Sequence, residues 1–148
     1  MNLSSSLEDY LEAILNIRGK DGMVRVTDLS REMKVEKPSV NYAVNKLKKL
    51  KLVAHEKYKG VFLTVQGEVL ANKVKKRHSI ILRFLHDILG LNITDADKEA
   101  CLIEHLISYN TVLRIKKFTE YIKKNSDYNE KDFKSRFDTF VETDEIFE

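Results

Sequence analysis

The stretch KVEKPSVNYAVNKLKKLKLVAHEKYKGVFLTVQG, residues 34–67, decides the fold of this chain. Pro38 suits the first turn of a helix, where the backbone amide needs no partner and φ is already set. Apolar residues then recur at the spacing of one helix face. They are Val40, Ala43, Val44 and Leu47. The stretch therefore predicts a short helix that opens near Pro38 and buries one apolar face.

The residues after this helix predict a small hairpin. Two strand-like runs, VAHEK (53–57) and VFLT (61–64), are separated by YKG, in which Gly60 supplies the turn. A helix followed by a basic hairpin is the pattern of a winged helix-turn-helix, in which the helix can enter a major groove and the wing can touch phosphates. The alternative is an ordinary α+β fragment with a solvated lysine face.

The charge of the chain is segregated along its length, although the formal net charge is only +3. Residues 31–77 hold thirteen Lys or Arg against four Asp or Glu, whereas residues 127–148 hold three against eight. This distribution predicts a polyanion-binding face in the middle of the chain only. Scattered solvated charge would allow the same segregation but would not predict it.

Length and composition exclude several classes of protein. The 148 residues suffice for one domain or two small ones. No apolar run approaches the roughly 20 residues that span a bilayer, and the first residues, MNLSSSLEDY, do not resemble a signal peptide. The single cysteine, Cys101, cannot form an internal disulfide, which suits a reducing cytoplasm. We therefore expect a cytoplasmic protein without a membrane segment.

Helical periodicity covers most of the remaining sequence, so the expected fold class is mostly α. A short strand at 24–26 is expected to pair with the wing. Thr27, Thr64 and Thr94 are expected to cap helices, and Gly90 to end one. The expected helices span residues 4–18, 27–33, 65–89, 94–108, 110–124 and about 130–140. The long helix predicts a boundary inside it, which gives a DNA-binding domain at 1–72 and a helical domain at 73–148.

A group of potential metal ligands lies in the second half of the chain. Cys101, Glu104 and His105 are spaced i, i+3, i+4, so on a helix they share one face. Thiolate, carboxylate and imidazole together suit late first-row divalent ions. Further ligands would have to come from His78, Asp9 and Glu12, so the hypothesis requires three distant helices to converge. The alternative is structural, with Cys101 as a small buried hydrophobe and His105 as a core histidine.

At this point the sequence resembles the diphtheria toxin repressor and manganese transport regulator family of metal-dependent repressors. The resemblance covers nearly the whole chain, from SLEDYLEAIL through the winged helix-turn-helix segment to VKKRH and EACLIEHLIS. It implies a winged helix-turn-helix DNA-binding domain followed by an all-helical dimerisation and metal-binding domain. It also implies that the SH3-like third domain of longer members is absent.

The resemblance implies roles for individual residues. Asp9 and Glu12 match first-helix ligands of the manganese branch, and His78 matches the ligand histidine of the long helix. Cys101 stands where the iron branch has cysteine, and Glu104 and His105 match the shared Glu-His pair. The chain thus mixes the two branches. Leu82 departs from the iron-type pattern, which places an acid there for a second site.

A metal-bound state is then expected to hold a homodimer whose recognition helices match a palindromic DNA operator, with the first helix loosely held until metal binds. The expected cofactor is Fe²⁺ or Mn²⁺, and Co²⁺, Ni²⁺ or Zn²⁺ could also bind. Residues expected at the DNA are Lys37, Pro38, Ser39, Asn41, Tyr42, Lys46, Lys57 and Lys59.

Two alternatives remain open from the sequence. One is a winged-helix regulator that metal does not control, in which Cys101, Glu104 and His105 are packing residues. The other is a small metalloenzyme, which would need an open coordination position and a substrate pocket. A basic wing would have no purpose in an enzyme, so we expect a regulator without catalytic activity.

Overall fold

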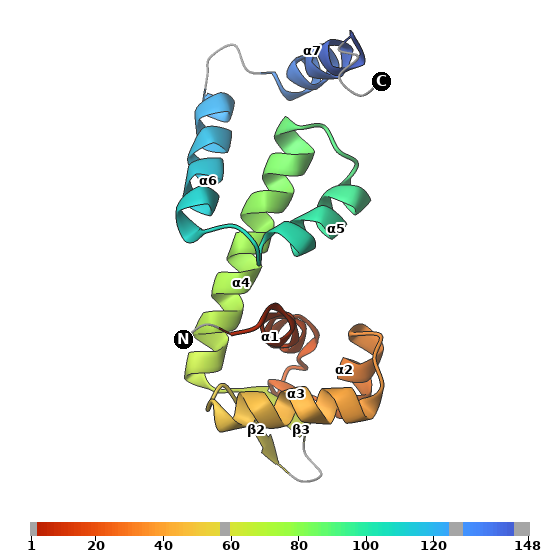
Figure 1. Cartoon of the computed structure of the whole chain (residues 1–148), viewed down its shortest axis with the longest axis vertical. Helices are drawn as coiled ribbons and strands as arrows, with labels where there is room; N and C mark the ends of the chain where they lie inside the picture. The colour runs from red at the N-terminus through yellow and green to blue at the C-terminus, as the bar shows by residue number, and fades with distance from the viewer. Residues whose placement is uncertain (1–2, 57–59, 125–128, 144–148) are drawn as a thin grey trace. The chain divides into compact units, whose positions relative to one another are not determined.

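The computed structural model describes residues 3–56, 60–124 and 129–143. The chain divides into two compact units, Met1–Lys75 and Lys76–Glu148, and the division falls within one long helix, α4 (Val65–Arg83) (Figure 1). Each unit has its own hydrophobic core. Within the described ranges, no helix combines the length and the apolar character that a membrane span requires.

The N-terminal unit combines helices with a three-stranded antiparallel sheet of order β1-β3-β2. Val24 lies opposite Val61 in the register of β1 and β3, and Val53 lies opposite Leu63 in that of β2 and β3. The expected hairpin and its pairing with a short strand are thus confirmed. The elements are α1 (Ser5–Ile17), β1 (Met23–Val24), α2 (Val26–Glu32), α3 (Lys37–Lys49), β2 (Val53–Glu56) and β3 (Gly60–Leu63).

The core of this unit forms between α1, α2, α3 and the sheet, which Figure 1 shows grouped together. The predicted apolar face of α3 is confirmed, because Val40 and Leu47 are fully buried. From α1, Leu11 and Ile14 are also fully buried. The first helix is therefore an integral part of the core, and this packing does not fit the expectation of a loosely held first helix.

Thr64 joins the end of α3, the wing and the start of α4. Its backbone N–H donates to the Leu52 carbonyl at 3.0 Å, and its hydroxyl lies 2.8 Å from the Lys51 carbonyl oxygen. The same hydroxyl accepts the Gly67 N–H at 3.1 Å, which confirms Thr64 as the N-cap of α4. A Cβ added to Gly67 would lie 1.8 Å from the Leu52 carbonyl oxygen. Only glycine allows so close an approach of the two backbones.

Two of the predicted helix caps are wrong. The cap of α2 is Arg25, in an extended conformation and without a side-chain capping bond, because the helix already begins at Val26 rather than after Thr27. The β1 strand correspondingly spans only Met23 and Val24, whereas residues 24–26 were expected to form it. The cap of α5 (Ile93–Ile103) is Asn92 rather than Thr94, and its side chain accepts the Asp95 N–H at 3.0 Å. Asparagine is a stronger capping residue than threonine.

Helices are the regular secondary structure of the C-terminal unit, and its described residues include no strand. After Arg83 the long helix continues as one π-helical turn, η1 (Phe84–Ile88), and the chain reverses at Gly90, whose φ is +77°. Two further helices are α6 (Tyr109–Lys124) and α7 (Glu130–Thr143). The core of the unit consists of Ile81, Leu85, Ala96, Ala100 and Val112.

Candidate metal centre and DNA-binding face

All the residues of α3 that were predicted from the sequence to contact DNA lie on the exposed face of this helix. This face lies opposite the buried one, as an amphipathic helix on a protein surface requires. A helix with one polar face free of the core has the dimensions to enter a major groove. The exposed residues are Lys37, Pro38, Ser39, Asn41, Tyr42 and Lys46. The wing residues Lys57 and Lys59 lie outside the described residues.

Two of these side chains hold each other in place. The Lys46 ammonium lies 4.6 Å from the centre of the Tyr42 ring, which is the geometry of a cation–π contact one helical turn apart. Both residues also line a groove of about 590 Å³ between α1 and α3, together with Ser4 and Ser39. The face therefore presents a cation, an aromatic ring and hydroxyls beside one another.

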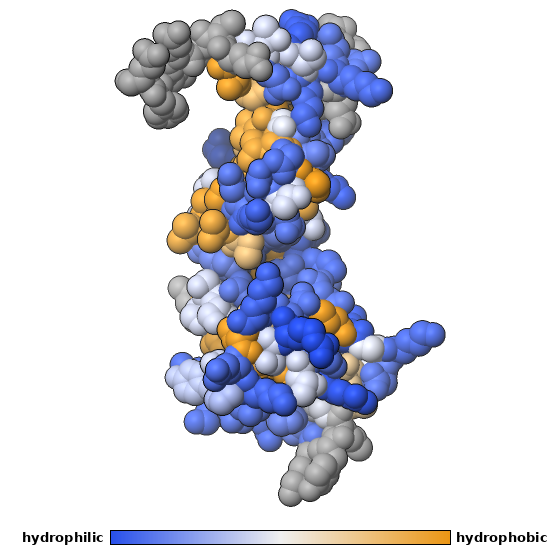
Figure 2. Space-filling view, turned by 90° about the vertical axis from the view of Figure 1, so that its right-hand side faces the viewer, coloured by the Kyte–Doolittle hydropathy of each residue, from blue (hydrophilic) through white to orange (hydrophobic). Residues whose placement is uncertain are grey.

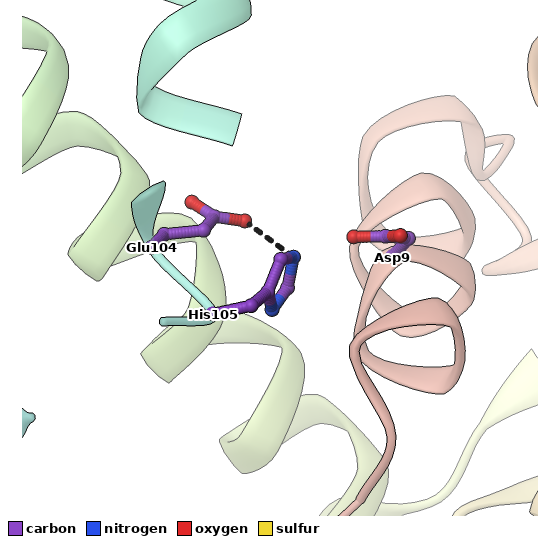
Figure 3. A group of neighbouring side chains, drawn as sticks. All are labelled: Asp9, Glu104 and His105. Carbon is purple, nitrogen blue, oxygen red and sulfur yellow. Dashed lines mark ion pairs between the residues drawn. The ribbon is translucent and has the colours of Figure 1, made fainter. Parts of the chain in front are cut away.

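The candidate metal centre in the C-terminal unit is built around Glu104. This carboxylate is fully buried, although charged side chains are rarely buried unless they are paired. Oε2 lies 3.1 Å from His78 Nδ1, and Oε1 lies 3.2 Å from His105 Nε2. Figure 3 shows the Glu104 and His105 side chains and the ion pair between them. The long helix thus supplies one imidazole, and the segment after α5 supplies the carboxylate and the second imidazole.

One oxygen of this buried carboxylate lacks a hydrogen bond. Oε1 has no hydrogen-bond partner among the described residues, despite its proximity to His105. An unsatisfied buried oxygen is costly, and such atoms call for an explanation such as an ion. A carboxylate between two imidazoles is a donor set that suits a first-row divalent metal. His78, Glu104 and His105 therefore fit a metal ion chemically.

The structure brings only some of the nominated ligands together in this unit. The helix predicted over 94–108 is wrong at its end: α5 stops at Ile103, and Glu104 and His105 lie in the turn that follows. Cys101 is exposed, whereas Glu104 is fully buried. Asp9 and Glu12 belong to the other unit, where they are half-buried on α1.

Asp97 is a residue of this centre that the sequence reasoning missed. Its Oδ1 lies 3.1 Å from Nε2 of His78, on the opposite edge of the ring from Glu104. The signal that could have found it is spacing, since Asp97, Cys101 and Glu104 stand at i, i+4 and i+7. The sequence pattern placed Asp97 in the first turn of the expected helix, as an acid that favours the helix dipole, and not at a metal centre.

Large apolar side chains remain exposed on the C-terminal unit. Leu106 is 83% exposed and Leu102 is 70% exposed, although the neighbouring Ile103 and Ile107 pack against the core. Tyr109 and Tyr121 of α6 are also exposed. Figure 2 shows hydrophobic side chains gathered on the face of this unit that is turned to the viewer. An exposed apolar surface of this kind is typical of a protein interface.

Comparison with known proteins agrees with a DNA-binding face in the N-terminal unit and a metal centre in the C-terminal unit. Residues 2–61 match the family model described as the N-terminal DNA-binding domain of iron-dependent repressors. Residues 64–132 match the model of the metal-binding and dimerisation domain of the same repressors.

Individual relatives are regulators. A helix-turn-helix-type transcriptional regulator of Methanocaldococcus jannaschii is 36% identical over 82% of this chain and 98% of its own length. The regulator MntR of Bacillus subtilis is 33% identical over 88% of this chain and 90% of its own.

A solved structure of the manganese regulator SloR superimposes with a TM-score of 0.69 at 31% identity, covering 82% of this chain. The present chain spans about 55% of the length of that solved chain. Both family models, the curated relatives and the winged helix-turn-helix fold lead to one conclusion. The chain belongs to the iron-dependent repressor family, which pairs a DNA-binding domain with a metal-binding and dimerisation domain.

Proposed function

We propose that this chain is a metal-dependent transcriptional repressor that binds a palindromic DNA operator as a homodimer and responds to Fe²⁺ or Mn²⁺. The observation that carries the proposal is the fully buried Glu104, flanked by two histidines and left with one oxygen without a hydrogen bond among the described residues. Residues 1–72 would form the DNA-binding domain, and residues 73–148 the dimerisation and metal-binding domain. A protein that binds a DNA operator would work in the cytoplasm, where the DNA is. We propose no catalytic activity for it.

His78, Glu104 and His105 are proposed as ligands because they already converge in one unit. Asp9, Glu12 and Cys101 are proposed from the sequence pattern and from the family resemblance. A divalent cation bound by these groups would supply the positive charge that several neighbouring carboxylates need. The carboxylates favour manganese, whereas a thiolate at Cys101 would move the preference toward iron.

The packing of α1 determines what such a ligand set would do. Because Leu11 and Ile14 anchor α1 in the core of the N-terminal unit, ligation by Asp9 or Glu12 would hold that whole unit and not α1 alone. The side chains of α3 would then be held at a fixed spacing from those of the second subunit. A dimer reads half-sites that are one helical turn, or a multiple of it, apart. Metal can shift this equilibrium only by its greater affinity for the DNA-competent state.

The proposed DNA contacts divide into two kinds. Ser39, Asn41 and Tyr42 lie on the exposed face of α3 and would meet base edges, with Lys37 and Pro38 at its start. Lys46, Lys57 and Lys59 would meet phosphates, which position a protein without specifying sequence.

The test is the affinity for a candidate palindromic operator, measured anaerobically by fluorescence anisotropy at fixed salt with Mn²⁺, Fe²⁺ or a chelator. We expect tight binding only with metal, and loss of that dependence in Glu104→Ala. Glu99→Ala is the matched control, because Glu99 is an exposed acid on the helix that precedes Glu104. In Cys101→Ala we expect binding to persist with an altered preference between the two metals.

Equal binding by the wild type with metal and with chelator would refute the metal switch. The winged helix-turn-helix would then serve a regulator that answers to another signal, with Glu104 in a structural role. A metal response that Glu104→Ala retains would refute the proposed ligand set.

A further inference from the structure

The ring of His78 lies between two carboxylates of the C-terminal unit. Its Nδ1 is 3.1 Å from Glu104 Oε2, and its Nε2 is 3.1 Å from Asp97 Oδ1. The histidine comes from α4, whereas Asp97 lies on α5 and Glu104 directly follows that helix. Two acids seven residues apart thus bracket one imidazole from a neighbouring helix.

The two carboxylates differ in their surroundings. The Glu104 side chain is fully buried, whereas the Asp97 side chain is 65% exposed. The imidazole between them is 16% exposed. The Glu104 edge of the ring is therefore the inner edge, which faces the candidate metal centre, and the Asp97 edge faces solvent.

An imidazole can ligate a metal through one nitrogen only when that nitrogen carries a lone pair. In the neutral ring the proton then sits on the other nitrogen, and the hydrogen bond made there fixes the tautomer and the ring orientation. Ligating histidines commonly donate their second N–H to a carboxylate for this reason.

We propose that Asp97 is the positioning residue of His78. It accepts the Nε2–H of the ring, so that Nδ1, on the Glu104 side, is the nitrogen whose lone pair would face a divalent cation held there. This inference rests on the proposed function, because it assigns a role around the same centre.

The geometry separates this role from that of a ligand. The two ring nitrogens point away from each other, so an ion held at Nδ1 by His78 and Glu104 lies on the far side of the ring from Asp97. The exposed Asp97 carboxylate therefore acts through the imidazole and does not contact the ion.

The experiment compares the wild type with Asp97→Ala, Asp97→Asn and the control Glu99→Ala. The tautomer of His78 is measured in the metal-free protein by long-range ¹H–¹⁵N NMR. The affinity and stoichiometry for Co²⁺ are measured anaerobically from its visible absorption, with Mn²⁺ as competitor. The tautomer measurement does not depend on whether metal binds.

In the wild type we expect a proton on Nε2, donated to Asp97, whether or not Nδ1 also donates to Glu104. Asp97→Ala should lose this preference and bind Co²⁺ about 10- to 100-fold more weakly with unchanged stoichiometry. Asp97→Asn retains a carbonyl acceptor and should keep the tautomer with a smaller loss of affinity. Glu99→Ala should match the wild type in both measurements.

An unchanged His78 tautomer in Asp97→Ala would overturn the inference, as would an affinity within about twofold of the wild type. A lower stoichiometry in Asp97→Ala would also overturn it, by making Asp97 a ligand. A wild type that binds no Co²⁺ or Mn²⁺ would instead refute the proposed function, and the tautomer comparison would still decide the role of Asp97.

Discussion

Lys51 follows α3 in the left-handed backbone conformation, with φ of +60°. A side chain there costs about 1 kcal/mol or more, which glycine avoids. We expect Lys51→Gly to raise the free energy of unfolding by about 0.5 to 1 kcal/mol, measured by urea denaturation. The control is Lys49→Gly, in the last turn of α3. That substitution should lower the free energy of unfolding by about 1 kcal/mol, because glycine is unfavourable inside a helix. Destabilisation by both variants would contradict the strain at Lys51.

Gly67 illustrates the opposite situation, in which no side chain can be added. Because a Cβ at this position would lie 1.8 Å from the Leu52 carbonyl oxygen, Gly67→Ala must push α4 away from the backbone after α3. We expect a loss of about 3 kcal/mol in the free energy of unfolding, at the upper end for overpacked sites.

The matched control for Gly67→Ala is Gln66→Ala, at the preceding and exposed position of the same helix. Its midpoint in urea should stay close to that of the wild type. If Gly67→Ala showed an equally small effect, the close approach of the two backbones would not constrain this joint.

At the scale of the element, some residues of α3 should contribute to the affinity for any DNA and others to the preference for one sequence. We expect Lys46→Ala to weaken binding to all DNA sequences alike and to lower the slope of log K against log salt by about one, since one phosphate contact is lost. Anisotropy titrations over a range of salt concentrations, with operator and unrelated DNA, measure both quantities.

Lys117→Ala is a suitable control for this loss of charge. Lys117 lies on α6 of the C-terminal unit, where it pairs with Glu120. Its removal should leave the salt slope unchanged. A change in base preference in Lys46→Ala would show that Lys46 reads a base edge instead of a phosphate.

The elements differ in how far the sequence could predict them. The apolar faces of α1 and α3 follow from periodicity, because burial of one face demands that spacing. The caps at Arg25 and Asn92 could not be chosen from composition, since several polar residues stand near each helix start. The end of α5 at Ile103 was missed because apolar residues continue at helical spacing after it.

The candidate centre was predictable only in part, for a related reason. The ligand types at His78, Glu104 and His105 are visible in the sequence, and in the structure both histidine side chains lie close to the Glu104 carboxylate. The pairing of His78 with Asp97 depends on how α4 packs against α5, which no local pattern encodes. The difference in burial between Cys101 and Glu104 likewise depends on that packing.

At the scale of the whole molecule, the exposed leucines of the C-terminal unit should control assembly. Leu106 is 83% exposed, and a charge there would be desolvated on burial in a homodimer. We expect Leu106→Glu to be a monomer by light scattering under conditions in which the wild type is a dimer. Operator affinity should fall with it, because a palindrome engages two subunits.

The control for this prediction is Val65→Glu. Val65 is 82% exposed, but it lies at the start of α4 in the N-terminal unit. This variant should remain dimeric. A dimeric Leu106→Glu protein would place the subunit interface elsewhere on the C-terminal unit.

The bonds around Thr64 also bear on how the molecule opens. The backbone N–H of Leu52 donates to the Leu47 carbonyl, and the N–H of Thr64 donates to the Leu52 carbonyl. The N–H of Gly67 donates to the Thr64 hydroxyl. These three amides link the end of α3, the base of the wing and the start of α4. Their exchange with deuterium should therefore follow one shared cooperative event of the N-terminal unit, rather than independent fraying of three segments. In such a repressor the surface that contacts DNA would be either fully folded or fully unfolded.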